Sequence, residues 1–143
     1  MNKGKALTPK TLAKKIAQLA LTKKAHNVTI LDLRKLTDMA DFFVVCSADS
    51  DVQVKAISDA IIEGTETIGV SAWHREGITQ RQWVLLDYVD VVAHVFHREA
   101  RRFYGLEKLW GDARIEVVED KPEKPTRVKK TPSAKPRAAK AAK

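Results

Sequence analysis

The chain has 143 residues, enough for one domain with a sizeable hydrophobic core and too few for two ordinary domains. Its net charge of +8 is unevenly distributed, because residues 121–143 hold nine of the 26 Lys and Arg and one of the 18 Asp and Glu, which leaves 17 of each in residues 1–120. The charge therefore gives no indication of a basic groove on the folded part. We predict one domain in residues 1–120 and a disordered Lys-, Pro- and Ala-rich tail in residues 121–143.

Cysteine content and hydropathy narrow the protein class further. The single cysteine, Cys46, lies in an apolar run, which excludes a disulfide framework and a thiolate zinc site and predicts a buried, inert thiol. The sequence has neither a signal-peptide core near its start nor a run of about 18 apolar residues. These features are typical of a soluble protein of the cytoplasm that does not bind membranes.

The predicted elements alternate between helices and strands. Thr8 and Pro9 are typical of a helix start, and Ser50 and Gln53 have the spacing of a capping box. Together with the hydrophobic pattern they predict a helix over 9–24, strands over 28–33 and 42–47, a helix from Ser50 to between Gly64 and Gly69, a strand over 70–74, two strands within 81–97, and a helix over 97–104 that ends at Gly105. The expected fold is a single α/β domain with a mixed sheet of about five strands, flanked by helices mainly on one side.

The stretch RQWVLLDYVDVVAHVFH, residues 81–97, has the pattern of a β-hairpin. If Tyr88 and Val89 form a two-residue turn, Trp83 lies opposite His94, and Leu85 lies opposite Val92. One face then carries only aliphatic residues, as in a sheet face that is buried under helices: Val84, Leu86, Val91, Ala93 and Val95. The other face mixes aromatic, aliphatic and polar residues, as a recognition surface does: Trp83, Leu85, Asp87, Asp90, Val92, His94 and Phe96. Alternatively, another part of the chain covers this second face, and His94 is an ordinary core histidine.

Two groups of residues have some features of a metal or catalytic site. His94, His97 and Glu99 are close in sequence, but a strand histidine and a helix-start histidine need not converge, so we expect neither a metal nor another cofactor.

Asp49 and Asp51 have the spacing of paired carboxylates that hold magnesium in nucleotidyl transfer. Ser50 between them is typical of a helix N-cap, and the sequence has no glycine-rich phosphate loop. We therefore favour capping and expect no catalytic residue; a magnesium-dependent nucleotidyltransferase stays as the alternative.

The tail allows a third interpretation, in which its cations bind nucleic acid through counterion release. It has no aromatic residue for stacking on bases, so such binding would tolerate any sequence. A solvated tail without a partner explains the composition equally well.

Six motifs resemble, in order and spacing, those of the ribosomal silencing factor (RsfS, Iojap-like) family. They cover about residues 6–115: Asp41-x-Phe43, Ser50-x-x-Gln53-Val54-x-Ala56-Ile57, His74-Arg75-Glu76-Gly77, Trp83-Val84-Leu85-Leu86-Asp87-Tyr88, Asp90-Val91-Val92-x-His94-Val95-Phe96, and Phe103-Tyr104-x-Leu106-Glu107-x-Leu109-Trp110. Val89 departs from the family, which commonly has glycine at this place in the turn.

The resemblance implies a fold similar to that of nucleotidyltransferases but without their chemistry. It implies binding to the large ribosomal subunit through ribosomal protein number fourteen of that subunit, which prevents the small subunit from joining and represses translation under nutrient limitation. We expect Trp83 to be the apolar anchor of this contact, with His94 as its hydrogen-bonding neighbour. The expected surrounding contacts are Leu85, Tyr88 and Phe96. The same face is predicted to form a homodimer in the free protein. With a ribosomal partner, the basic tail, residues 121–143, would have ribosomal RNA within its reach as a further contact.

Overall fold

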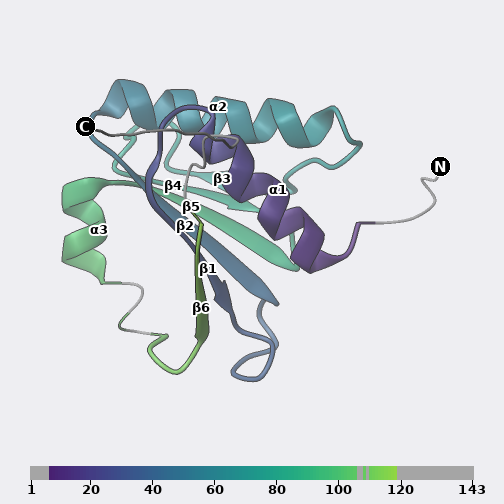
Figure 1. Ribbon diagram of the computed structural model, residues 1–143. Coiled ribbons are helices and arrows are strands. Elements are labelled where there is room, and N and C mark those ends of the chain that lie inside the picture. The colour runs from purple at the N-terminus through teal and green to yellow at the C-terminus, as the bar shows by residue number, and fades with distance from the viewer. Residues whose placement is uncertain (1–6, 106–107, 109, 119–143) are drawn as a thin grey trace, which may run out of the picture.

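The computed structural model describes residues 7–105, 108 and 110–118. Within them a six-stranded mixed sheet has the strand order β3-β4-β5-β2-β1-β6 and packs with three helices (Figure 1). The helices are α1 (Pro9–Leu21), α2 (Asp51–Glu66) and α3 (Arg98–Tyr104), and the strands are β1 (His26–Asp32), β2 (Phe42–Ala48), β3 (His74–Glu76), β4 (Trp83–Asp87), β5 (Val91–His97) and β6 (Arg114–Val118). The predicted single-domain α/β fold with a mixed sheet is confirmed.

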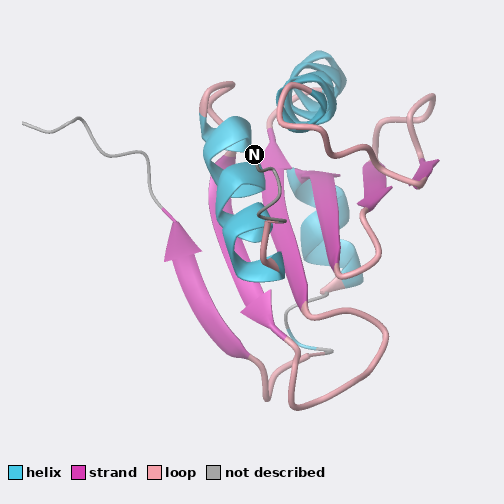
Figure 2. Ribbon diagram, turned by 90° about the vertical axis from the view of Figure 1, so that its right-hand side faces the viewer, coloured by secondary structure: helices cyan, strands magenta, loops and turns pink. Residues whose placement is uncertain are grey.

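Helices cover the two faces of the sheet unequally. α1 and α2 pack against each other and against one face, whereas α3 lies on the opposite face (Figures 1 and 2). The central strands β2 and β5 run parallel, and every other strand pair is antiparallel. All seven residues of β2 are buried, as expected for a strand that is covered on both faces.

Side-chain caps fix where the first two helices start. Thr8 accepts a hydrogen bond from the backbone N–H of Thr11 and precedes Pro9, and Ser50 accepts one from the N–H of Gln53. Each cap satisfies a backbone donor that the helix itself leaves unpaired. α3 ends at Gly105, which has a left-handed φ of 57°. All three signals were predicted.

The hairpin of β4 and β5 keeps its predicted faces but not its predicted register. The N–H of Tyr88 donates to the carbonyl of Val91 at 2.8 Å, so the turn residues are Val89 and Asp90, one position later than predicted. Trp83 therefore pairs with Phe96, and the predicted pairing with His94 is wrong by two residues. Because side chains alternate with a period of two, this shift leaves every residue on its predicted face.

The five aliphatic residues of the hairpin accordingly belong to the core under α1 and α2, as predicted.

The turn between β4 and β5 has a strained centre. Val89 has a φ of 76°, and the N–H of Asp90 donates to the carbonyl of Tyr88 at 3.0 Å, which is the pattern of a γ-turn with positive φ. β-Branched residues rarely adopt this conformation.

Other boundaries differ from the sequence prediction. The strand predicted over residues 70–74 lies at His74–Glu76, and β6 was not predicted. β6 is a short, mostly exposed edge strand that pairs with β1, so its hydrophobic pattern is weak. The predicted tail, 121–143, lies outside the described residues. Among the described residues, no helix is both long and apolar enough to cross a lipid bilayer.

Candidate functional site

The sheet face opposite α1 and α2 carries a cluster of aromatic side chains. We call Phe43, Trp83, Leu85, His94, Phe96 and Tyr104 the aromatic face; they come from β2, β4, β5 and the end of α3. The Trp83 ring stacks on Phe96 with a centroid distance of 4.9 Å and lies 4.7 Å from the ring of Tyr104. Phe43 meets His94 edge-on at 4.5 Å. The rings thus hold one another in fixed orientations.

Trp83 and His94 are also joined by a hydrogen bond. The indole N–H of Trp83 donates to Nδ1 of His94 at 3.0 Å. His94 is only 3% exposed, and burial lowers the pKa of its imidazole to about 3, so the ring is neutral near pH 7. With Nδ1 as the acceptor, Nε2 carries the proton. Nε2 is buried and has no hydrogen-bond partner among the described residues.

Accessibility divides the aromatic face into two layers. Trp83 and Leu85 are partly exposed and Tyr104 is 52% exposed, whereas His94 and Phe96 are buried. Part of the cover comes from the chain itself, because Ala100 of α3, Trp110 and Ala113 pack against this face. The alternative from the sequence, in which another part of the chain covers this face, therefore holds for His94 and Phe96. The accessible layer consists of Trp83, Leu85 and Tyr104.

The fifth predicted contact residue, Tyr88, lies elsewhere. It is buried in the core under α1 and α2, and its hydroxyl lies 2.9 Å from the hydroxyl of Thr65 in α2. Burial raises the pKa of the Tyr88 phenol. The structure thus brings Trp83, Leu85, His94 and Phe96 together and separates Tyr88 from them. Tyr88 directly follows β4, and the alternation continued from the strand points it to the helix-covered face.

The sequence interpretation missed two members of the aromatic face. Phe43 and Tyr104 were part of the motifs that carry the family resemblance, but neither was proposed as a contact residue. Tyr104 reaches Trp83 because α3 follows β5 directly and folds back over the sheet. The available signal in the sequence was the aromatic pair Phe103 and Tyr104 at the end of a charged helix, since aromatic residues are enriched at interfaces. The structure shows both side chains to be exposed.

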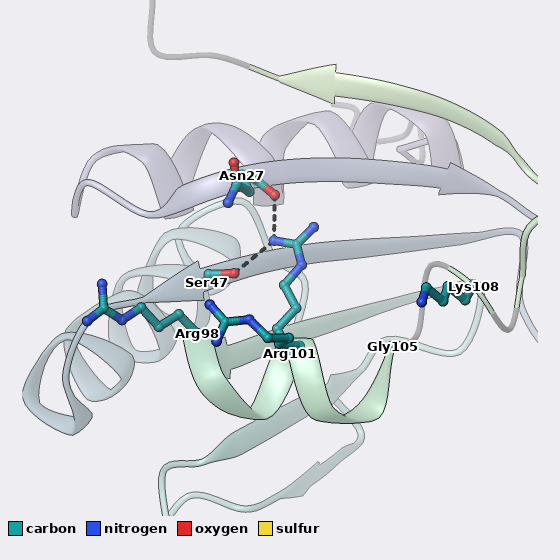
Figure 3. Close-up of a pocket in the computed structure, with 7 residues that line it drawn as sticks. Asn27, Ser47, Arg98, Arg101, Gly105 and Lys108 are labelled. Carbon is teal, nitrogen blue, oxygen red and sulfur yellow. Dashed lines mark hydrogen bonds between the residues drawn. The ribbon is translucent and has the colours of Figure 1, made fainter.

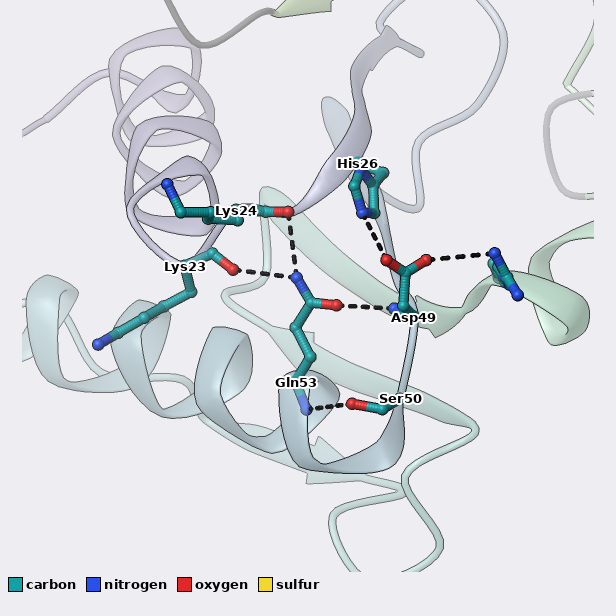
Figure 4. Close-up of polar contacts among 7 residues, drawn as sticks. Lys23, Lys24, His26, Asp49, Ser50 and Gln53 are labelled. Atoms are coloured by element: carbon teal, nitrogen blue, oxygen red, sulfur yellow. Dashed lines mark hydrogen bonds and ion pairs between the residues drawn. The ribbon is translucent and has the colours of Figure 1, made fainter.

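Asp49, which lies just before α2, has structural partners (Figure 4). The Asp49 carboxylate lies 2.9 Å from Nε2 of His26 and 3.5 Å from Nη1 of Arg98. The Gln53 side chain accepts a hydrogen bond from the backbone N–H of Asp49 and donates to the carbonyls of Lys23 and Lys24. The capping box is thus incomplete, because Gln53 turns toward the end of α1 instead of the N–H of Ser50. This arrangement ties the two helices together.

The remaining reactive side chains lie at structural positions. Nδ1 of His97 accepts a hydrogen bond from the N–H of Glu99 at the start of α3, while Nδ1 of His94 is occupied by Trp83. In the part of the chain that the structure describes, no three His, Cys, Asp or Glu side chains gather as metal ligands would. Cys46 is buried, as predicted, and burial raises the pKa of its thiol to about 12, which disfavours the reactive thiolate.

Comparisons with known proteins agree on one family. The sequence model of a family described as "Ribosomal silencing factor during starvation" matches residues 6–143. A ribosomal silencing factor RsfS of Bacillus subtilis is 39% identical over 107 residues, which cover 75% of this chain and 91% of that protein. The RsfS of Halalkalibacterium halodurans is 44% identical over 91 residues, 64% of this chain and 78% of its own. The chloroplastic Iojap protein of Zea mays is 34% identical over 106 residues, 72% of this chain and 45% of its own.

Solved structures show the same similarity in three dimensions. A crystal structure of a Chromobacterium violaceum protein matches with a TM-score of 0.72 and 29% identity, covering 80% of this chain and 95% of that one. A Bacillus halodurans crystal structure matches with a TM-score of 0.66 and 35% identity, covering 77% and 98%. The arrangement of sheet and helices is therefore shared with solved proteins.

Proposed function

This chain belongs to the ribosomal silencing factor family, and from that premise we propose that it binds the large ribosomal subunit through ribosomal protein number fourteen of that subunit. Occupying this surface prevents the small subunit from joining and thereby represses translation when nutrients are short. The protein acts in the cytoplasm, where the ribosomes are, and it acts by binding without catalysing a reaction.

The partly exposed indole of Trp83 is the observation that supports this proposal best. Its ring is held by the hydrogen bond to His94 and by contacts with Phe96 and Tyr104. An aromatic anchor that is already fixed loses little conformational entropy when a partner covers it. Buried aromatic anchors near the centre of an interface also carry a large share of the binding free energy.

The residues of the aromatic face have different roles in the proposed contact. Trp83 is the anchor, and Leu85 and Tyr104 surround it at the surface. His94 and Phe96 act as positioning residues that fix the Trp83 ring from below, because both are buried in the free protein. Tyr88 acts only through the fold, since its hydroxyl meets Thr65 on the other side of the sheet.

Steric exclusion requires occupancy of the surface and no chemistry at it. A dissociation constant of about 10 nM would need about 11 kcal/mol of binding free energy, which a well-packed interface of ordinary size can supply. When the protein is present well above this concentration, it occupies most large subunits by mass action. These subunits are then no longer free to join a small subunit.

Sucrose-gradient sedimentation of the purified protein with separated ribosomal subunits tests the proposal. We expect the protein to sediment with the large subunit and not with the small one, and we expect fewer joined ribosomes when both subunits are present. Joined ribosomes at the level of a protein-free gradient, with the added protein remaining at the top, would contradict the proposed function.

A further inference from the structure

A strongly basic pocket lies between α3 and the strands β1 and β2. It has a volume of about 470 Å³ and is lined by Asn27, Ser47, Arg98, Arg101, Arg102, Gly105 and Lys108. We call it the basic pocket. Four of these seven residues are cations and none is acidic, although residues 1–120 as a whole hold equal numbers of basic and acidic residues.

Arg101 forms the inner wall of the pocket. Its Nη1 donates to the carbonyl of Asn27 at 2.7 Å and to the hydroxyl of Ser47 at 2.9 Å. Figure 3 shows this side chain reaching from α3 toward both strands, with Arg98 and Lys108 on either side of it. The basic pocket is therefore built on secondary structure, which holds its donors in place better than a loop would.

The cations at the rim have little acidic compensation. Arg102 and Lys108 are exposed and make no ion pair with a described residue. Arg98 lies 3.5 Å from Asp49, but its side chain is 61% exposed and that of Asp49 is 53% exposed, so water screens the pair. The carbonyl end of a helix such as α3 offsets only about half of one charge. The pocket consequently retains a positive potential.

We propose that the basic pocket binds phosphate groups of an RNA backbone. Guanidinium groups match the geometry of phosphate oxygens, and a lysine beside them adds a point charge. Arg98 and Arg102 lie four residues apart in α3, so their side chains emerge from the same face of the helix. No aromatic side chain lines the pocket, so it contacts phosphates without reading bases.

The location of the pocket connects it with the aromatic face. α3 contributes Tyr104 to the aromatic face and Arg98 and Arg102 to the basic pocket. A partner surface of protein and RNA can therefore engage both through one helix, and this part of the inference rests on the proposed function, which supplies a ribosomal partner. The cations then add to affinity and to the rate of association.

The test uses the full chain and a fluorescein-labelled oligouridine of about 12 nucleotides, long enough to fill a typical single-strand site. Fluorescence anisotropy measures binding across a series of salt concentrations. The test variant carries Arg98→Gln, Arg102→Gln and Lys108→Gln, and leaves Arg101 in place because of its structural hydrogen bonds. The control variant carries Lys10→Gln, Lys14→Gln and Lys23→Gln, which removes the same charge from exposed positions in and after α1.

At about 50 mM salt, we expect the test variant to bind the oligouridine about ten-fold more weakly than the parent. The slope of the logarithm of the binding constant against the logarithm of the salt concentration should be shallower by about 2. The control variant should change both quantities much less. Equal losses in the two variants would overturn the proposal, because net charge alone would then account for binding. So would parent-like binding by a test variant whose circular dichroism shows an intact fold.

Competition with inorganic phosphate at constant ionic strength distinguishes the RNA backbone from a free anion. We expect phosphate to displace the labelled oligouridine only at concentrations far above those at which unlabelled oligouridine does, because a chain of phosphates contacts several cations at once. Displacement by inorganic phosphate as effective as that by the same concentration of oligouridine phosphates would overturn the assignment to RNA. Because the probe is isolated RNA, a negative result leaves binding to the large subunit intact. Conversely, a protein that fails in the sucrose gradient can still show the predicted difference here.

Discussion

Trp83 and His94 lie diagonally across the β4–β5 hairpin and are joined by a hydrogen bond of 3.0 Å. The residues directly opposite them are Phe96 and Leu85, respectively. Diagonal neighbours on one sheet face are within reach of long aromatic side chains. This relationship fixes the tautomer of His94, orients the indole ring at the surface, and links a buried polar group to the proposed contact.

Burial of His94 predicts a stability that depends on pH. The pKa of His94 is about 3 in the folded protein and about 6.5 in an unfolded chain, so between these values only the unfolded chain binds the proton. Above about pH 6.5 His94 is neutral in both states, and the free energy of unfolding keeps its full value. As the pH falls from there toward 3, protonation of the unfolded chain lowers the free energy of unfolding by about 1.4 kcal/mol per pH unit. Urea unfolding of the parent and of His94→Asn between about pH 6.5 and 4.5 should show a shallower pH dependence in the variant.

Acidic side chains do not obscure this comparison. The hydrogen bond from the Arg34 side chain lowers the pKa of the Asp32 carboxyl to about 2, so Asp32 loses its contribution only below about pH 3.8, and it is present in both proteins. Identical pH dependence in the parent and in His94→Asn would show that His94 is not held neutral by burial.

Gln53 is predicted to stabilise the junction of α1 and α2. Gln53→Ala removes two hydrogen bonds to the carbonyls of Lys23 and Lys24 and one from the N–H of Asp49. We expect the free energy of unfolding to fall by about 2 kcal/mol in urea titration. Gln18→Ala is the matched control, because Gln18 is exposed in α1 and its side chain bonds to no described residue. An equally small change in both variants would rule out this role.

Val89→Gly is predicted to stabilise the protein. Val89 is 58% exposed and has a φ of 76°, a conformation that glycine adopts without steric cost. Relief of this strain exceeds the extra entropy of the unfolded chain, so we expect a gain of about 1 kcal/mol in thermal or urea unfolding. Val52→Gly serves as the control, since Val52 is also exposed, at 70%, but lies in α2, where glycine should destabilise. A lower stability of Val89→Gly would show that the turn is unstrained.

The accessible layer of the aromatic face is predicted to pair with a second copy of the chain when the ribosome is absent. A two-fold contact would cover Trp83, Leu85 and Tyr104 in both copies. Sedimentation equilibrium over a range of concentrations should therefore show a reversible dimer, and Tyr104→Ala should weaken it because this side chain is 52% exposed. A monomer mass at every concentration would contradict this prediction.

Local signals in the sequence predicted most of the fold. Thr8 with Pro9, Ser50, and Gly105 mark element ends through chemistry within a few residues, and all three are confirmed. Alternation sorted the hairpin into its two faces, although the register was wrong. β6 could not be recognised in this way, because a short edge strand such as Arg114–Val118 depends on pairing with β1, which is distant in sequence.

The candidate site was predictable only in part for the same reason. Side chains alternate along a strand with a period of two, and this period can be read from the sequence. It places four residues on one face: Trp83, Leu85, His94 and Phe96. Tyr104 joins them only because α3 folds back over β5, and Tyr88 leaves them because the turn begins one residue later than predicted. Both outcomes are set by tertiary packing and turn geometry.

Two tryptophans provide a matched pair of variants for the proposed ribosomal contact. Trp83 belongs to the aromatic face, whereas Trp73 is 68% exposed in the segment before β3 and lies outside it. Trp83→Ala removes the proposed anchor, and Trp73→Ala removes the same side chain from another part of the surface. Circular dichroism and thermal unfolding establish that each variant is folded before binding is measured.

Calorimetric titration of the two variants with purified ribosomal protein number fourteen of the large subunit tests the central claim most directly. The account predicts saturable binding by the parent and by Trp73→Ala, and a loss of more than about 2 kcal/mol in Trp83→Ala, which is about thirty-fold in the dissociation constant. Parent-like affinity of a folded Trp83→Ala protein would contradict the claim that the aromatic face makes this contact.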